Sequence, residues 1–186
     1  MFQHILVPLD RSARAERAIP VAASIAHASG GCITLLQVVS LSTEFAWRTR
    51  ESVMLQATFD ADRAQAAAYL ARLAASEELA GLTTITEVSN GQTAQLILAV
   101  ASSQSLEAPP VDLIILCSHG ATGFTRWALG SVAQKVARHS PVPVLILQER
   151  GACRPPCIQA VCVQCVSWYR WTALHSQSRH SLQQPT

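Results

Sequence analysis

Charged side chains are scarce in this chain of 186 residues. Asp, Glu, Lys and Arg make up 14% of it, Lys135 is its only lysine, and hydrophobic residues make up 49%, enough to bury a sizeable core. No apolar run approaches the roughly 20 residues of a membrane span. Residues 1–150 carry eleven basic and twelve acidic side chains, so they have no basic excess to attract nucleic acid. We therefore expect neither a membrane nor a nucleic-acid partner.

The N-terminus also lacks the charged segment and small-residue cleavage site of a secretory signal, so the cytoplasm is the expected location. Of the six cysteines, Cys32 and Cys117 lie at the ends of predicted strands and are expected to be reduced, structural thiols. The other four lie between residues 153 and 165 and contain a single CxxC. Structural zinc sites usually pair two such motifs, so we expect no metal site.

Short apolar runs alternate with helical patterns up to Arg150, which predicts stacked βαβ units around a parallel sheet. Residues 111–116 are apolar on both faces except for Asp112, as in a buried central strand. Pro141 and Pro143 precede the last strand and indicate a sheet edge. The expected fold of residues 1–150 is a doubly wound, Rossmann-like α/β domain with three layers and five parallel strands. Strands are expected at about 4–9, 32–39, 83–88, 111–116 and 144–147, and helices at about 12–29, 52–79, 93–103 and 131–139.

Residues 151–186 do not continue this alternation. They contain three arginines, no acidic residue, three prolines and two tryptophans. We expect a C-terminal tail with little regular structure, appended to the domain of residues 1–150.

The segment after the fourth strand has the layout of an anion-binding loop. An aliphatic strand runs into a loop with Gly120 and Gly123, and the loop returns to a helix that opens with Gly130 and Ser131. Glycine lets the backbone approach a ligand, and a helix N-terminus offers unpaired N–H groups to phosphates. Ser131 and Gln134 also fit a capping box, which needs no ligand. The glycines match neither the Walker loop nor the dinucleotide fingerprint.

This loop resembles that of the universal stress protein family, in which Gly, two residues, Gly, nine residues and Gly-Ser or Gly-Thr follow one another. Gly120, Gly130 and Ser131 fit the pattern, and Cys117 replaces its first glycine. The resemblance covers about residues 1–149 and begins at Ile5-Leu6-Val7-Pro8. It implies an adenine-nucleotide-binding α/β fold. For the branch of the family that keeps the glycine loop, it implies ATP bound between the first and fourth strands.

The resemblance also implies which residues form the site. By matching position, Pro8, Leu9 and Asp10 would lie beside the adenine and ribose, Val38 would pack on the adenine, Leu116 and Cys117 would run past the ribose, and Gly120, Gly130, Ser131 and Val132 would hold the phosphates. Asp10 is alternatively a turn residue before the first helix. Open α/β sheets bind ligands beyond the carboxyl ends of their strands, where strand order reverses, and these positions agree with that rule.

The function implied is an ATP-binding regulator of the stress response, with ATP, alone or with Mg²⁺, as its ligand. His119 has no nucleophile partner in the loop, and no carboxylate pair marks a metal, so no catalytic residue is assigned. A slow ATP hydrolase and a structural dimer module without nucleotide are the alternatives. Members of the family pair through their last edge strand, so a homodimer through residues 142–147 is expected.

Overall fold

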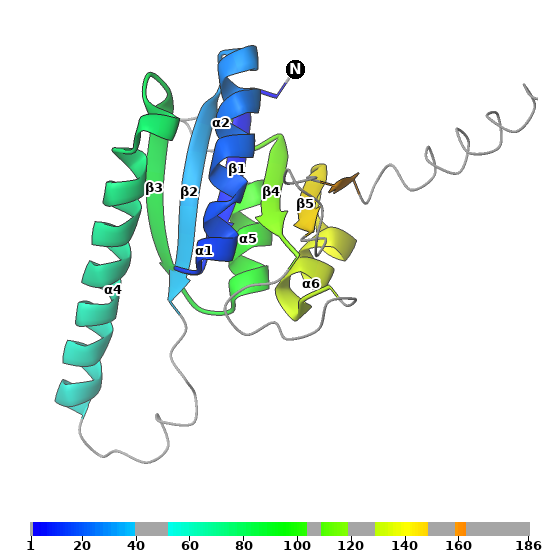
Figure 1. The fold of residues 1–186 in the computed structure, drawn as a ribbon. Coiled ribbons are helices and arrows are strands. Elements are labelled where there is room, and N and C mark those ends of the chain that lie inside the picture. The colour runs from blue at the N-terminus through cyan, green and yellow to red at the C-terminus, as the bar shows by residue number, and fades with distance from the viewer. Residues whose placement is uncertain (1, 40–51, 104–108, 119–128, 149–158, 163–186) are drawn as a thin grey trace, which may run out of the picture.

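The computed structural model describes residues 2–39, 52–103, 109–118, 129–148 and 159–162 of the chain. These residues form a three-layer α/β fold (Figure 1). Helices α1 (Ala13–Glu16), α2 (Ala18–Ser29) and α4 (Ser52–Ala74) cover one face of a central sheet, and α5 (Thr93–Ser102) and α6 (Ser131–His139) cover the other. None of the described helices combines the length and the apolarity that crossing a membrane requires.

The sheet consists of β1 (His4–Leu9), β2 (Cys32–Val39), β3 (Thr83–Asn90), β4 (Leu113–Cys117), β5 (Val144–Gln148) and β6 (Gln159–Cys162). Its strand order is β3-β2-β1-β4-β5-β6, and β1 to β5 are parallel. The five predicted parallel strands and the doubly wound topology are therefore confirmed. Strand order reverses between β1 and β4, since the chain builds outward from β1 in one direction and from β4 in the other.

The predicted helix over residues 12–29 is two helices, α1 and α2, separated at Arg17. Pro20 explains the interruption, because it has no N–H to donate to the carbonyl of Glu16, four residues earlier. Gly30 ends α2 with a φ of 66°, a left-handed conformation that glycine adopts at little cost. One face of the two helices is directed to the core and consists of buried residues: Ala15, Ala18, Ile19, Ala22 and Ala26.

Other predicted boundaries shift, among them the end of the third strand, which lies at Asn90 and not at residue 88. The helix expected to reach residue 79 ends at Ala74, and a separate 3-10 helix, η1 (Glu77–Leu79), follows it. The fourth strand begins at Leu113, two residues later than predicted. Asp112, the polar residue of the predicted strand, accepts hydrogen bonds from the backbone N–H groups of Gln3 and His4, at 2.6 and 3.2 Å. Its carboxylate thus fixes the start of β4 against the start of β1.

His4 anchors the same end of β1 from the interior. It is 6% exposed, and its Nδ1 lies 2.5 Å from the carbonyl oxygen of Pro109. Because a carbonyl only accepts, Nδ1 carries a proton. Nε2 lies 2.7 Å from Oγ1 of Thr34 on β2. Both ring nitrogens are therefore satisfied, and His4 has a structural role.

Alternate residues of each strand pack on opposite faces of the sheet, as strand geometry requires. Leu9 and Cys117 belong to the apolar cluster beneath α1, α2 and α4. Leu6, Val38 and Leu116 belong to the cluster beneath α5 and α6. This division decides which side chains can meet at the carboxyl edge of the sheet.

The sixth strand was not predicted. β6 pairs antiparallel with β5, with Leu145 opposite Cys162 and Gln148 opposite Gln159. The expectation that the strand after Pro141 and Pro143 forms the sheet edge is therefore wrong, because a segment of the C-terminal tail lies along it (Figure 1). The two prolines precede β5 and do not interfere with this pairing.

Candidate functional site

The carboxyl ends of β1 and β4 separate from each other. β1 pairs with β2 along its whole length, from His4 to Leu9. Its pairing with β4 comprises only Ile5 with Leu113 and Leu6 with Ile114. Beyond Leu6, the remaining residues of β1 and β4 are not paired with each other. The separation falls at the reversal of strand order, which is where open α/β sheets form their ligand crevice.

Asp10 lies at this edge, in the turn between β1 and α1. Its Oδ1 accepts hydrogen bonds from the N–H and the hydroxyl of Ser12, at 3.0 and 2.5 Å. The hydroxyl oxygen of Ser12 in turn accepts from the N–H of Ala15, at 3.1 Å, and caps α1. The interpretation of Asp10 as a turn residue is confirmed. Its side chain remains exposed, so a contact with a ribose stays compatible with this role.

Cys117, which stands in place of the first glycine of the loop pattern, is accommodated without backbone strain. Arg11 is the only non-glycine residue with a positive φ in the described segments. The Cys117 thiol donates to the backbone carbonyl of Arg14 in α1, with sulfur and oxygen 2.8 Å apart. The side chain therefore lies on the sheet face opposite α6. Cys32 is buried, and burial raises the pKa of its thiol, as expected of a structural cysteine.

Two backbone hydrogen bonds hold the start of α6 at the end of β4. The N–H of Ser118 donates to Leu147 of β5, and the carbonyl of Ser118 accepts from the N–H of Gly130, both at 2.8 Å. The second of these bonds joins the two ends of the connection between β4 and α6. Gly120 and His119 belong to that connection and lie outside the described residues, so the predicted role of Gly120 stays a prediction.

The predicted capping box at Ser131 is wrong. Gly130 occupies the cap position, with no side-chain cap, and Ser131 is the first residue of the helix. The first hydrogen bond within α6 runs from the N–H of Gln134 to the carbonyl of Gly130, at 2.9 Å. The N–H groups of residues 131–133 precede it and have no partner within the helix. Gly130 itself has a φ of −57°, which any residue can adopt.

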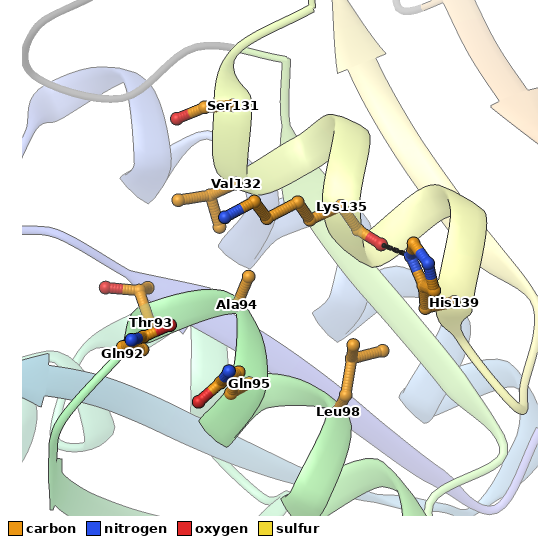
Figure 2. A pocket seen from close by; sticks show the side chains of 9 residues that line it. All are labelled: Gln92, Thr93, Ala94, Gln95, Leu98, Ser131, Val132, Lys135 and His139. Atoms are coloured by element: carbon orange, nitrogen blue, oxygen red, sulfur yellow. Dashed lines mark hydrogen bonds between the residues drawn. The ribbon is translucent and has the colours of Figure 1, made fainter.

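An open cleft of about 570 Å³ begins at this helix start and runs between α5 and α6 (Figure 2). α6 contributes Ser131, Val132, Lys135 and His139, and α5 with its cap contributes Gln92, Thr93, Ala94, Gln95 and Leu98. Sequence reasoning assigned no role to Lys135 and missed the wall from α5. The available signal was the turn at Asn90 and Gly91, which starts α5 at the carboxyl edge of β3.

The structure divides the predicted site residues into two groups. The side chains of Val38 and Leu116 pack on the face of α5 and α6, where Val132 also packs, and strand alternation places Pro8 there with Leu6. Leu9 and Cys117 pack on the other face. Gly130 and Ser131 stand at the start of α6. The side chains on the face of α5 and α6 thus share one side of the site. Leu9 and Cys117 can contribute to that side only through their backbone groups.

Fold and site together define a doubly wound α/β domain in which β1 and β4 separate at the topological switch point, with the start of α6 at the end of β4. The sequence model of the universal stress protein family matches residues 1–148, and the chain belongs to this family. A comparison with curated proteins found no match.

Solved structures of the family share the fold. Universal stress protein UspA from Lactobacillus plantarum is 29% identical, with a TM-score of 0.62, over 78% of this chain and 97% of that one. The hypothetical protein MJ0577 is 24% identical, with a TM-score of 0.69, over 82% and 99%. A universal stress protein in complex with cAMP is 23% identical, with a TM-score of 0.54, over 79% and 97%. These relatives are covered almost completely, whereas 18–22% of this chain lies outside the matches.

Proposed function

We propose that the protein binds ATP at the carboxyl edge of its sheet, between β1 and β4, and that the nucleotide controls a binding module of the stress response, which forms a homodimer through residues 142–147 when β6 leaves the edge of β5. The observation that carries the proposal is the hydrogen bond from Gly130 to Ser118, which holds the start of α6 beside the crevice. Membership of the universal stress protein family and a relative in complex with cAMP support an adenine nucleotide as the ligand.

The base and the ribose would occupy the apolar side of the crevice. Pro8, Val38 and Leu116 present apolar surface from the face that carries α5 and α6. Leu9 and Cys117 would contribute backbone groups, because their side chains pack on the opposite face. The exposed carboxylate of Asp10 would accept a hydrogen bond from a ribose hydroxyl.

The phosphates would bind the backbone N–H groups at the start of α6. Ser131 adds a hydroxyl, and Val132 and the N-cap Gly130 complete this end of the helix. Gly120 would close the site from the loop. The helix dipole also favours an anion here. If Mg²⁺ accompanies ATP, the phosphates and water would supply most of its ligands, because Asp10 is the only carboxylate among the proposed site residues. No side chain is assigned a catalytic role.

The substitution Gly130→Asp tests the proposal. Asp is a favoured N-cap residue, so the domain should stay folded, while the new carboxylate competes with phosphate for the N–H groups of α6. In the unchanged protein, ATP at 100 times its dissociation constant should stabilise the fold by about 2.7 kcal/mol and raise the melting temperature. Gly130→Asp should abolish this shift.

Gly130→Ala is the matched control, because the φ of −57° at this position suits alanine and the N–H groups stay open. It should keep the response to ATP. An equal response to ATP in Gly130→Asp would overturn the phosphate assignment. A stable protein that never responds to adenine nucleotides would leave the alternative of a structural module.

A further inference from the structure

The cleft between α5 and α6 has the lining of an anion site. Its nine lining residues include no carboxylate, and Lys135 is a cation among them. Figure 2 shows the Lys135 side chain extended along α6 toward Val132. Lys135 is also the only lysine of the chain. His139 closes the far end of the cleft, and its Nδ1 donates to the carbonyl of Lys135 at 3.0 Å.

Polar side chains form the wall opposite Lys135. Gln92, Thr93 and Gln95 line the cleft from α5, and Gln92, the cap residue, makes no side-chain cap hydrogen bond. The first hydrogen bond within α5 runs from the N–H of Leu96 to the carbonyl of Gln92, at 3.0 Å. Amide, hydroxyl and backbone N–H donors from the start of α5 therefore belong to the same cleft as the Lys135 amine.

The cleft continues the proposed phosphate site. Ser131 and Val132 belong to both, whereas Asp10, Val38 and Leu116, which would hold the base and ribose, are not among the cleft residues. A nucleotide placed with its sugar at the crevice would direct its outer phosphates into the cleft. Each added phosphate brings negative charge toward Lys135, and a charged hydrogen bond is roughly twice as strong as a neutral one.

We propose that Lys135 is a specificity-determining residue that binds the outer phosphates and makes the protein select a nucleoside triphosphate over the monophosphate or the nucleoside. This inference rests on the proposed function. The ligand class is a nucleotide with a polyphosphate chain. Thr93 and Gln95 complete the cleft from the opposite wall.

The experiment compares Lys135→Gln with the unchanged full-length protein by isothermal titration calorimetry against ATP, AMP, adenosine and inorganic tripolyphosphate. Loss of the ammonium group should weaken ATP and tripolyphosphate binding about tenfold or more. AMP and adenosine affinities should change less than about twofold. Lys135→Arg should recover most of the ATP affinity, because it keeps the charge.

Arg138→Gln provides the matched control. Arg138 is exposed on the same helix, three residues further on, and does not line the cleft. If Lys135 binds phosphate directly, Arg138→Gln should leave ATP affinity within about twofold of the original. Equal losses in both variants would mean that only net charge matters, and the inference would be wrong.

Failure of this inference and failure of the proposed function give different results. ATP binding that is the same in the original protein and in Lys135→Gln overturns the role of Lys135 alone. An original protein that binds neither ATP nor adenosine overturns the proposed function. If that protein still binds tripolyphosphate and Lys135→Gln does not, Lys135 remains assigned to an anion cleft. Absence of tripolyphosphate binding as well overturns both.

Discussion

Gly31 is a residue whose side chain would collide with the backbone of a neighbouring segment. A Cβ built on it lies 2.7 Å from the carbonyl oxygen of Gln3 and 3.0 Å from that of Phe2. The same Gln3 carbonyl accepts the N–H of Cys32 at 2.9 Å, so the backbone cannot retreat without losing a bond. We expect Gly31→Ala to lower the free energy of unfolding by about 2–3 kcal/mol, measured by urea denaturation followed by circular dichroism.

Substitution of Gly30 is the control that measures the cost of backbone conformation without a collision. It has a φ of 66°, and a Cβ added to it would meet no neighbouring atom within 4 Å, so Gly30→Ala should cost about 1 kcal/mol from conformation alone. A Gly31→Ala variant no less stable than Gly30→Ala would contradict the collision.

Single residues also show where sequence reasoning ends. Asp10 was predictable as a turn residue, because its type and position suffice. The left-handed φ of 65° at Arg11 was not, since arginine gives no sign of it and the conformation follows from the hydrogen bonds of Asp10 and Ser12.

At the scale of elements, α4 is tied to α1 through a half-buried tyrosine hydroxyl. Tyr69 on α4 donates to the Glu16 carboxylate on α1, at 3.0 Å. Burial, and then the hydrogen bond to Glu16, raises the pKa of Tyr69 above its usual value. The folded state thus holds this proton more tightly than the unfolded chain. The stabilisation is complete below about pH 10, the ordinary tyrosine pKa, and is lost as pH rises beyond it.

We expect Tyr69→Phe to lower the free energy of unfolding by about 1 kcal/mol at pH 8 and to reduce the further loss of stability between pH 9 and 11. Guanidinium denaturation at a series of pH values measures both effects. Arg72→Gln is the control. Its guanidinium lies 4.0 Å from Glu16 and its side chain is 70% exposed, so its removal should cost less than about 0.5 kcal/mol. An unchanged pH dependence in Tyr69→Phe would show that Tyr69 does not cause the loss of stability at high pH.

The elements themselves were largely predictable, because apolar alternation reports directly on burial. The bounds of β1 and β2 agree with those predicted from the sequence. The break at Arg17 had a visible cause in Pro20, which the helical pattern of alanines concealed. The strand β6 had no visible cause in the sequence, because its four residues lie in a tail without alternation. They form a strand only because β5 offers an edge, and that edge depends on the tertiary arrangement.

For the whole molecule, the topology made part of the site predictable. Parallel strands bring their carboxyl ends to one edge, so the positions of Asp10, Val38 and Gly130 followed from the order of elements. The side of the sheet on which each side chain packs did not follow from that order. This side differs for Cys117 and α6, which lie on opposite faces. The cleft depends on the distance between α5 and α6, which no local pattern encodes.

The edge of β5 sets the oligomeric state that we expect for the molecule. A homodimer through residues 142–147 remains our proposal, but in this chain β6 already satisfies that edge over Leu145–Gln148. A two-fold axis normal to the sheet would pair β5 with β5 of a second copy in the same antiparallel sense that β6 adopts. The two strands therefore compete for the same N–H and C=O groups, and the edge is open to a partner only after β6 leaves.

Removal of residues 151–186 should consequently shift the protein from monomer to dimer. Light scattering after size exclusion should give about 20.0 kDa for the full chain and about twice its own chain mass for the truncated one. Val161→Pro tests the same point in the full chain, because proline removes an N–H from β6 opposite Ile146 and should also promote the dimer. A dimeric full chain would show that β6 does not exclude a partner, since the competing strand is still present. Monomers in all three proteins would rule out pairing through β5, because the edge would then be open in two of them and still unused.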